Sequence, residues 1–412
     1  SPYRSGGYST YFDNTDRVYL TNDMSVALGT SEFSMEAWIY RTTTDADENV
    51  IVNGPGNDNG WGLAISGGKI RARFHNTNLI LGATTVSPNE WHHVMIARTS
   101  SNELLIFLDG TPDARSTSSS INYDATSTTL TIGSYSDRTA AVSYGFNGYI
   151  RDARVIVGYN TFPYGSYGTS VGINYFTPPS EPLTAVSGTE ALLCGLPYHG
   201  DLSSNSHSVS ETGGAVTKPF SPYDYIEYSA TDHGGSVYFD GTGDYLTTTS
   251  SNYSLGSSSA FTFELWYRFD DFLSSPATIF DYYDGSGNNI NKLAITSANV
   301  YLYNAQASAN ILAYAFEHQA NIWYHFCWAR DASNNHVFYI NGHQVGTSNS
   351  STNLNGEILD FGRRAGTYNN TLMKGHLSDI SLIKGSVTRT SNFTPPTAPL
   401  SSTGTTLHIK GT

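Results

Sequence analysis

The chain has few charged side chains and few basic ones. Asp, Glu, Lys and Arg make up 14% of its 412 residues, well below the roughly 25% of ordinary globular proteins. With 35 acidic and 21 basic residues, its formal net charge is −14. No basic patch is visible in the sequence. Recognition of nucleic acid is therefore excluded, because phosphate binding needs clustered Lys and Arg. The acidic excess also disfavours anionic membrane surfaces.

Long apolar runs and matched cysteines are also lacking. No stretch of 18 apolar residues is present, so no membrane-spanning helix is expected, and no signal peptide is recognisable. The two cysteines, Cys194 and Cys327, lie at unrelated positions of the sequence. We expect both to be buried small hydrophobic residues, and neither a disulfide nor a metal pair.

What the chain has instead is a duplication. Residues 33–38 (FSMEAW) return as 261–266 (FTFELW), and 91–98 (WHHVMIAR) as 323–330 (WYHFCWAR). Later in the same order, 148–152 (GYIRD) return as 375–379 (GHLSD), and 176–183 (FTPPSEPL) as 393–400 (FTPPTAPL). A repeat of this length is a whole duplicated domain and not a solenoid unit of ~20–50 residues.

The local pattern in both copies predicts strands. Short runs of Val, Ile, Tyr, Phe and Thr alternate with polar residues and end in Gly, Asn, Asp or Ser. Asp109-Gly110 and Asn341-Gly342 predict tight hairpin turns. We expect one domain over residues 1–198, a Ser-, Gly- and Asn-rich linker over 199–227, and a second domain over 228–412.

A short motif marks both copies. Ser1-Pro2-Tyr3 opens the chain and recurs at residues 221–223, just before the second copy. The chain begins without Met, so the first copy starts where a preceding linker would have ended. We therefore expect a processed product or a segment of a longer protein.

These signals together resemble one family. The segment YFDGTGDYL at 238–246, interpreted as an opening hairpin, precedes FTFELW, WYHFCWAR, FYING and the FTPP tail in the second copy. This order resembles concanavalin A-like, laminin-G-type jelly rolls, which are found repeated in bacterial surface proteins and phage virion proteins. The resemblance implies an all-β fold of two tandem jelly rolls. In such sandwiches the recurring Trp residues at 38, 91, 266 and 323 would belong to the core.

Catalytic motifs are not found. Laminarinase-like glycoside hydrolases of this fold carry E-x-D-x-x-E, because retaining hydrolysis needs two carboxylates ~5–5.5 Å apart. Here Glu36 and Glu264 recur singly, as Glu-x-Trp. His93 and His325 also recur without the partners of a triad or zinc motif. We expect all four to be structural, and the protein not to be an enzyme.

Calcium is the metal that the loops would suit, although no cofactor is required by the sequence. Ca²⁺ takes 6–8 oxygen ligands, several of them from carboxylates. The candidate ligands lie in two acidic loops, without EF-hand spacing: Asp45, Asp47, Asp58, Asp281 and Asp284. A polar loop without metal is the alternative interpretation.

Sugar binding would need an exposed aromatic ring beside amide or carboxylate groups. Two loops have this composition, and the candidate ligand-binding residues are Asn57, Asp58, Asn59 and Trp61 in the first copy, and Tyr282, Tyr283, Asn288 and Asn289 in the second. The Tyr-rich insertion with Tyr159, Tyr164 and Tyr167 could instead contact another protein. A plain solvated loop remains the alternative for each.

Two functions fit these observations. The first is a non-enzymatic phage virion decoration, fibre or appendage subunit, whose partners are virion proteins or further copies of itself. The second is a carbohydrate-binding adhesion module of a bacterial surface or secreted protein, with host-surface glycans as partners. Both place the protein on a virion exterior or in the extracellular space, without membrane insertion.

Overall fold

In the computed structural model, the chain forms two compact domains. The structure describes residues 1–3, 7–21, 26–44, 47–54, 60–74, 77–116, 121–123, 129–134, 144–158, 176–223, 229–272, 276–284, 286, 289–305, 307–364 and 371–411. Domain 1 comprises Gly6–Ile226, and domain 2 comprises Ser1–Ser5 together with Glu227–Thr412. Each domain is described by itself below.

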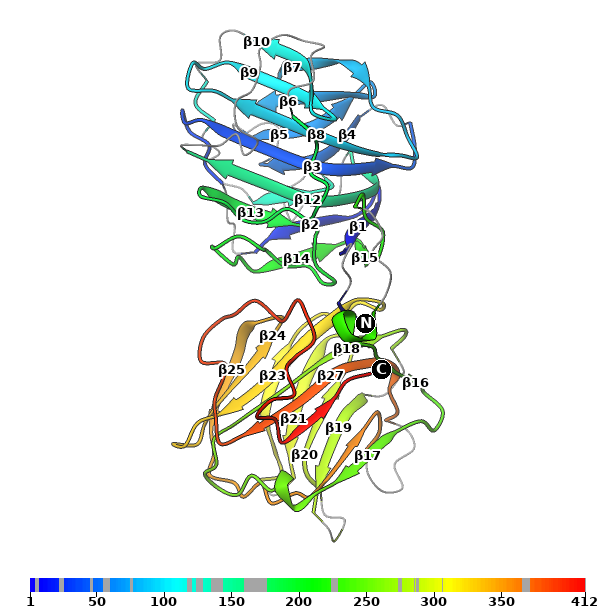
Figure 1. The fold of residues 1–412 in the computed structure, drawn as a ribbon, viewed down its shortest axis with the longest axis vertical. Helices are drawn as coiled ribbons and strands as arrows, with labels where there is room; N and C mark the ends of the chain where they lie inside the picture. Colours follow the sequence, from blue (N-terminus) through cyan, green and yellow to red (C-terminus); the bar gives the residue numbers. More distant parts are fainter. Residues whose placement is uncertain are drawn as a thin grey trace. The chain divides into compact units, whose positions relative to one another are not determined.

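Domain 1 contains two antiparallel sheets (Figure 1). The first sheet follows the order β10-β9-β8-β3-β12-β1-β15, and β13 pairs beside it with β12. Its strands are β1 (Ser9–Asp13), β3 (Phe33–Arg41), β8 (Trp91–Arg98), β9 (Leu104–Leu108), β10 (Thr111–Ser116), β12 (Asn147–Val157), β13 (Thr189–Leu193) and β15 (Val216–Lys218). The second sheet follows the order β14-β2-β11-β4-β5-β6-β7. Its strands are β2 (Arg17–Leu20), β4 (Asp47–Asn53), β5 (Trp61–Ser66), β6 (Lys69–Phe74), β7 (Thr77–Thr85), β11 (Leu130–Ile132) and β14 (Val209–Thr212).

Domain 2 repeats this plan. Its first sheet follows β16-β27-β18-β23-β24-β25, with β28 beside β27, and its second sheet follows β17-β26-β19-β20-β21-β22. The first contains β16 (Val237–Asp240), β18 (Phe261–Phe269), β23 (Trp323–Arg330), β24 (Asn335–Ile340), β25 (His343–Asn349), β27 (Lys374–Lys384) and β28 (Leu407–Ile409). The second contains β17 (Leu246–Thr249), β19 (Ala277–Tyr283), β20 (Asn289–Ile295), β21 (Asn299–Asn304), β22 (Ala309–Ala315) and β26 (Ile358–Phe361). Helix is limited in the described residues to α1 (Ala230–His233) and one 3-10 turn, η1 (Ser251–Tyr253).

The core of each domain lies between its two sheets. In domain 1 one continuous apolar cluster joins Ile39 of β3 and Val94 of β8 to Leu63 and Ile65 of β5 on the opposite sheet. Side chains of a strand alternate between faces, so every second residue points into this layer. The predicted all-β fold of two tandem sandwiches is thus confirmed.

The recurring Gly-x-x-x-Asp motif lies on the central strands β12 and β27. Gly148 and Gly375 have φ of +142° and +150°, and a Cβ on either would overlap a carbonyl oxygen of the neighbouring strand. Four residues later, Asp152 and Asp379 both have φ of +50°, at a break in the pairing register with β3 and β18. Such a bulge re-aims a side chain out of the regular alternation.

Two sequence-based expectations about connections are wrong. The segment 199–227 is not a linker throughout, because β14 pairs with β2 and β15 pairs with β1, which adds an edge strand to each sheet of domain 1. The segment 238–246 is not a hairpin either: β16 pairs with β27 in one sheet and β17 with β26 in the other. By contrast, the turns at Asp109-Gly110 and Asn341-Gly342 join paired strands as predicted.

Both cysteines are buried and free, as expected. Burial raises the pKa of the Cys194 thiol to about 12, which keeps it protonated and unreactive. Among the described residues, no helix is both long and apolar enough to cross a lipid bilayer.

Candidate functional site

Trp61 does not lie on an exposed loop. It is the first residue of β5, is 0% exposed, and its Nε1 donates a hydrogen bond to the Val26 carbonyl oxygen at 3.1 Å. The expectation of a sugar-stacking platform at Trp61 is therefore wrong. Its position opposite Asn53 turns the ring toward the core, where a large aromatic side chain is most stable.

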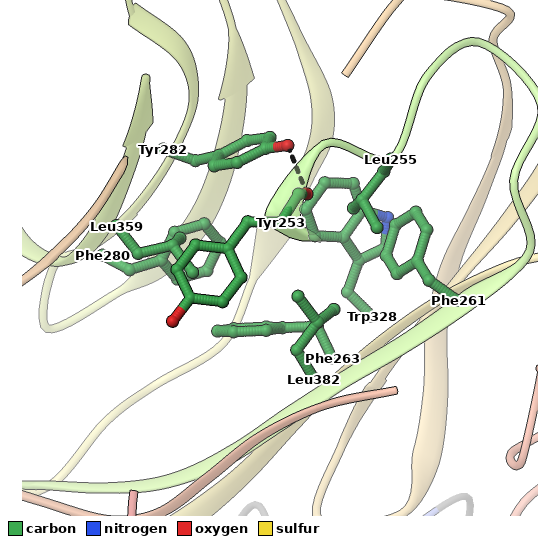
Figure 2. A pocket seen from close by; sticks show the side chains of 9 residues that line it. All are labelled: Tyr253, Leu255, Phe261, Phe263, Phe280, Tyr282, Trp328, Leu359 and Leu382. Carbon is green, nitrogen blue, oxygen red and sulfur yellow. Dashed lines mark hydrogen bonds between the residues drawn. The ribbon is translucent and has the colours of Figure 1, made fainter. Parts of the chain in front are cut away.

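Tyr282 is also buried, at 3% exposure. Its hydroxyl lies 2.8 Å from the Tyr253 carbonyl oxygen (Figure 2), and 2.7 Å from the Leu354 carbonyl oxygen. The ring thus anchors two turns from inside the sandwich and is not available to a ligand.

Several predicted site residues lie outside the described residues. These are the amide and carboxylate candidates Asn57, Asp58, Asn59 and Asn288, the metal candidate Asp45, and the tyrosines 159, 164 and 167. Asn289 is described through its backbone alone, which pairs with Tyr283 at the start of β20.

The described metal candidates are not gathered into one site. Asp47 begins β4 and lies 3.8 Å from an Arg71 nitrogen. Asp281 is buried in β19, and Asp284 accepts a hydrogen bond from the Ser286 N–H at 2.9 Å. No group of three or more His, Cys, Asp or Glu side chains suited to a metal occurs in the described part of the chain. Calcium binding stays a prediction, tested by the change in Tm with calcium against EDTA.

A polar row crosses the outer face of the six-stranded sheet in domain 2. The cross-strand register places six residues side by side, one from each strand: Thr247, Asp360, Asp281, Lys292, Tyr303 and Asn310. Their neighbours along the strands, such as Phe280 and Leu302, point the other way into the core at 1% and 0% exposure. Alternation therefore separates an apolar inner face from a face that carries two adjacent carboxylates, Asp281 and Asp360, which are themselves buried at 1% and 0% exposure.

At Asp360 of this row, four side chains from three segments of the chain form what we call the Tyr245 cluster: Tyr245, Tyr283, Asp360 and Arg363. The Tyr283 hydroxyl donates to Asp360 Oδ1 at 3.0 Å, and Arg363 Nε donates to Asp360 Oδ2 at 2.8 Å. The Arg363 guanidinium lies over the Tyr245 ring, 3.2 Å from its centroid, while Tyr245 keeps 44% of its surface exposed. The cluster thus presents an aromatic ring and a held guanidinium at the protein surface.

Burial shifts the pKa of two residues, Tyr283 of the cluster and Lys292 of the row. Burial raises the pKa of Tyr283, and the neighbouring Asp360 carboxylate raises it further, so the phenol stays protonated and donates. Burial also lowers the pKa of Lys292, with the positive charge of Arg364 acting in the same direction and Asp281 against it. Asp281 and Asp360 are 1% and 0% exposed, so the groups presented at the surface are the Tyr245 ring and the Arg363 guanidinium, which suit a ligand with hydroxyl groups and an apolar face.

Domain 1 has no such row. At the corresponding register its outer face carries Tyr19, Thr131, Val52, Gly62 and Arg73. Thr131 replaces one carboxylate and bonds the carbonyl oxygens of Val52 and Ser134. Sequence reasoning had selected Tyr283 and Asp281 but missed Tyr245, Asp360 and Arg363. The signal that could have found Asp360 is a charged residue at an alternating position of an otherwise apolar strand, ILDF.

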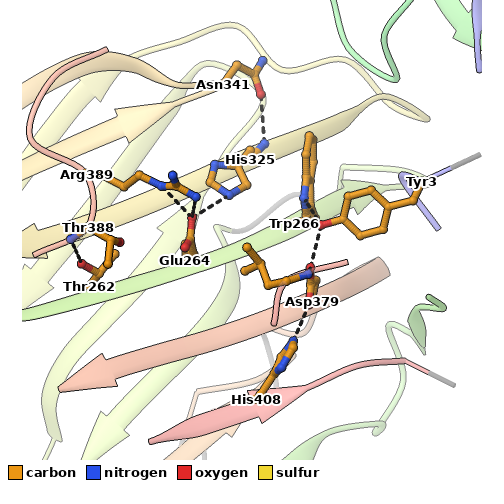
Figure 3. Close-up of polar contacts among 11 residues, drawn as sticks. Tyr3, Thr262, Glu264, Trp266, His325, Asn341, Asp379, Thr388, Arg389 and His408 are labelled. Carbon is orange, nitrogen blue, oxygen red and sulfur yellow. Dashed lines mark hydrogen bonds and ion pairs between the residues drawn. The ribbon is translucent and has the colours of Figure 1, made fainter. Parts of the chain in front are cut away.

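The recurring Glu and His residues form a buried ion pair in each domain, as a structural role requires. In domain 1, His93 Nε2 lies 3.0 Å from Glu36, and Arg154 donates to the same carboxylate at 2.6 Å. In domain 2, Glu264 lies 3.3 Å from His325 and 3.2 Å from Arg389 (Figure 3). These carboxylates are 0% and 2% exposed, so they lie inside their domains and do not meet solvent.

A cavity in the described part of domain 2 is also unsuited to a ligand. Its volume is about 20 Å³, and its lining is almost wholly aromatic and aliphatic (Figure 2): Tyr253, Leu255, Phe261, Phe263, Phe280, Tyr282, Trp328, Leu359 and Leu382. A cavity of this size and lining has too few polar groups to orient a sugar.

The chain was compared with curated proteins and with solved structures. No curated protein matches the chain in sequence. Among solved structures, domains LG4–5 of the mouse laminin α1 chain align over 97% of this chain and 94% of theirs, with 12% identity and a TM-score of 0.29. The SAP-like pentraxin of Limulus polyphemus aligns over 40% of this chain and 81% of its own, with 18% identity and a TM-score of 0.32. The CBM40 module of the Ruminococcus gnavus IT-sialidase, solved with α2,3-sialyllactose, aligns over 34% and 89%, with 16% identity and a TM-score of 0.27.

These values are too low to transfer a ligand or partner to this chain. The family profile is stronger, because it matches both copies separately. The profile described as the concanavalin A-like lectin/glucanases superfamily matches residues 12–157 and 240–391, together well over half of the chain. The chain therefore belongs to the concanavalin A-like lectin/glucanase superfamily, with two tandem laminin-G-type domains.

Proposed function

We propose that this protein is a non-catalytic, extracellular adhesion protein that binds carbohydrate through domain 2. The single observation that carries the proposal is the Tyr245 cluster. It combines an exposed ring, a guanidinium with fixed orientation and a buried carboxylate within one small surface.

The chemistry of the cluster fits a sugar. An aromatic face packs against the apolar face of a pyranose ring, while guanidinium and phenol groups bond its hydroxyls. Asp360 fixes both Arg363 and Tyr283, so little side-chain freedom is lost when a ligand binds. The small share of charged residues in the chain, 14%, is consistent with a neutral glycan.

Binding without hydrolysis is part of the proposal. The recurring carboxylates Glu36 and Glu264 are both committed to buried His and Arg partners. Asp360 is 0% exposed and bonds Arg363 and Tyr283, so its carboxylate does not meet a ligand at the surface. The absence of reducing-sugar release from any glycan that binds would agree with this.

The test is a glycan array with the full chain, followed by titration of the best ligand. We expect saturable binding to one sugar class, weakened about tenfold or more by Tyr245→Ala or Arg363→Ala. Tyr238→Ala is the matched control, since Tyr238 is also in domain 2 and is 47% exposed, but it lies on β16 of the other sheet. Equal loss in the control, or no saturable binding at all, would refute the proposal.

A second candidate is a virion decoration, fibre or appendage subunit. The duplicated scaffold favours it, because the two copies repeat core and turn residues while their outer faces differ. Electron microscopy of the purified protein would test it through the appearance of ordered symmetric assemblies.

A further inference from the structure

The recurring Ser-Pro-Tyr segments dock on equivalent sockets. Tyr3 belongs to domain 2 and is 3% exposed, and Tyr223 belongs to domain 1 and is 7% exposed. Each tripeptide folds the same way, with the tyrosine N–H donating to the hydroxyl of its serine, at 3.1 Å in the first and 3.3 Å in the second. A sequence feature that had marked a domain boundary is thus a docking element.

The socket of domain 2 is built around the bulged aspartate of β27 (Figure 3). The Tyr3 hydroxyl donates to Asp379 Oδ2 at 2.7 Å and accepts from Trp266 Nε1 at 2.8 Å. The two rings meet edge to face, 6.1 Å apart. Asp379 also accepts from the Leu400 N–H at 2.7 Å and lies 2.5 Å from His408. Serine adds one further bond, from its hydroxyl to the His233 carbonyl oxygen.

The socket of domain 1 uses the matching residues. The Tyr223 hydroxyl donates to Asp152, whose Oδ2 also accepts from the Leu183 N–H at 2.9 Å. The rings of Tyr223 and Trp38 meet edge to face, 6.3 Å apart. Here the guanidinium of Arg151 lies 5.1 Å from the tyrosine ring, where domain 2 has Ser378. The recurring Glu-x-Trp, Gly-x-x-x-Asp and Pro-x-x-Pro-Leu motifs therefore supply the same socket twice.

The two segments reach their sockets from opposite directions along the chain. Tyr223 follows the strands of domain 1 and docks on the domain that precedes it in sequence. Tyr3 precedes domain 1 in sequence, yet it docks on domain 2, 376 residues from Asp379. The same tripeptide thus fills both sockets, supplied by the end of the sequence of domain 1 in one case and by the start of the chain in the other. The contacts of Tyr3 are side-chain bonds within a small area, and they need no continuous backbone connection to domain 2.

We propose that Ser1–Tyr3 is an exchangeable anchor, which can fill the Asp379 socket of a second copy of this chain and so link copies head to tail. Exchange of an identical element preserves every contact of the closed form and changes only which chain donates it. Docking within one chain benefits from a high effective concentration, so linked copies accumulate as protein concentration rises.

The first measurement asks whether the socket binds a free segment. Tyr3→Ala empties the socket of the full chain, and a peptide of residues 1–8 (SPYRSGGY) is titrated into it. We expect one-to-one binding to Tyr3→Ala, and binding weaker by about tenfold or more to the unchanged chain, whose socket is occupied. The peptide of residues 221–228 (SPYDYIEY) is expected to bind as well, and a Tyr-to-Phe version of either to bind about tenfold more weakly.

The second measurement asks whether the anchor acts between chains. Tyr3→Ala supplies an empty socket, and Asp379→Ala supplies an anchor that has lost its own socket. We expect a mixture of the two variants to form heterodimers by sedimentation velocity, while each variant alone stays monomeric. Asp379→Ala also removes the acceptor of the Leu400 N–H, and this loss could unfold the domain. The peptide titration uses only Tyr3→Ala, so its result does not depend on whether Asp379→Ala folds.

Failure of both peptides to bind Tyr3→Ala would overturn the proposal. So would a mixture that stays monomeric when both variants are folded. Neither result bears on the glycan proposal, since Tyr3→Ala leaves Tyr245 and Arg363 unchanged and is expected to keep the affinity of the full chain for the glycan.

Discussion

The two domains share their buried polar framework and differ on the outer face of one sheet. Both have a buried Glu–His pair, an aspartate at a bulge, and a docked tyrosine. At the equivalent outer row, Asp281 and Asp360 of domain 2 correspond to Val52 and Thr131 of domain 1. All four of these residues are buried, at 0–1% exposure, and a buried hydrogen-bonded group can change only together with its partners. The framework is therefore repeated, and the candidate binding surface occurs once.

The arginine that completes the buried Glu–His pair is more exposed in domain 2 than in domain 1. Arg154, which completes the Glu36 pair, comes from the central strand β12 and has 3% exposed side chain. Arg389, which completes the Glu264 pair, follows β27 and has 24% exposed side chain. This difference allows the two domains to be separated by experiment.

The largest expected effect is the loss of stability of domain 2 in acid. Burial lowers the pKa of His318 from 6.5 to about 3 and that of His336 to about 4. The unfolded chain then binds these protons more readily than the folded one, so the stability is present above about pH 6.5 and is lost as pH falls toward 4 and below. Together the two histidines correspond to about 6–8 kcal/mol at most. Domain 1 has His199, with a pKa lowered by burial to about 4, but its side chain is partly exposed.

Thermal or denaturant unfolding from pH 7 to pH 4 would measure this, with His318→Gln and His336→Gln reducing the pH dependence. A domain 2 transition that is insensitive to pH in this window would contradict the prediction. In the same domain, burial raises the pKa of Glu264, but the hydrogen bond and charge of His325 and the charge of Arg389 outweigh it and hold the pKa below 4.5. This group adds a further loss only below about pH 4.5.

The second effect compares the two buried carboxylates. Glu36→Ala leaves Arg154 and His93 without their buried partner, so we expect domain 1 to lose about 3–5 kcal/mol. Glu264→Ala is expected to cost domain 2 about 1–3 kcal/mol, because Arg389 can turn toward solvent. Urea unfolding of the full chain, with the two transitions assigned by domain-specific tryptophan variants, measures both. Equal losses would show that the exposure of the arginine does not matter.

The third effect compares the docked tyrosines. Tyr3→Phe removes a donor to Asp379 and an acceptor of Trp266 Nε1, and we expect it to cost domain 2 about 2 kcal/mol. Tyr223→Phe removes a donor to Asp152 alone, since Trp38 Nε1 has no hydrogen-bond partner among the described residues. We expect a cost of about 1 kcal/mol in domain 1. Differential scanning calorimetry would measure both losses of stability. A larger loss for Tyr223→Phe than for Tyr3→Phe would contradict this interpretation.

The smallest expected effect on stability is at the proposed glycan site. Tyr245→Ala and the control Tyr238→Ala both replace a half-exposed tyrosine, so each is expected to change the free energy of unfolding by less than about 0.5 kcal/mol. Glycan affinity, in contrast, should fall only for Tyr245→Ala. A large stability change in Tyr245→Ala would mean that the ring has a structural role.

Sequence reasoning predicted most of the fold. The strands and hairpins of β8–β10 and β23–β25 were predicted, because they depend on local signals. These signals are the alternation of apolar and polar residues and the Asp-Gly and Asn-Gly turns. It failed at Trp61, because a short apolar stretch after a polar loop does not reveal whether its first ring points inward. It failed at Val209–Thr212 and Val216–Lys218, since edge strands with few apolar residues resemble linkers.

For the candidate site, the sequence supplied Tyr283 and Asp281 but not their neighbours. Asp360 and Tyr245 lie 77 and 38 positions from Tyr283 in the chain, and only strand pairing brings Asp360 within 3.0 Å of its hydroxyl. The sequence showed that Ser-Pro-Tyr is repeated. Its docking depends on the bulged aspartates Asp152 and Asp379, and no local sequence pattern predicts these bulges.

The sequence by itself determined the duplication, the all-β class, the burial of both cysteines and the positions of the tight turns, because these depend on local periodicity and on backbone conformations available to a few residue types. Only the tertiary structure decided which outer residues form one row, which aspartate receives each tyrosine, and that Tyr3 docks on domain 2. These contacts join residues as far as 376 positions apart, and they depend on cross-strand register, which one residue of slip would abolish.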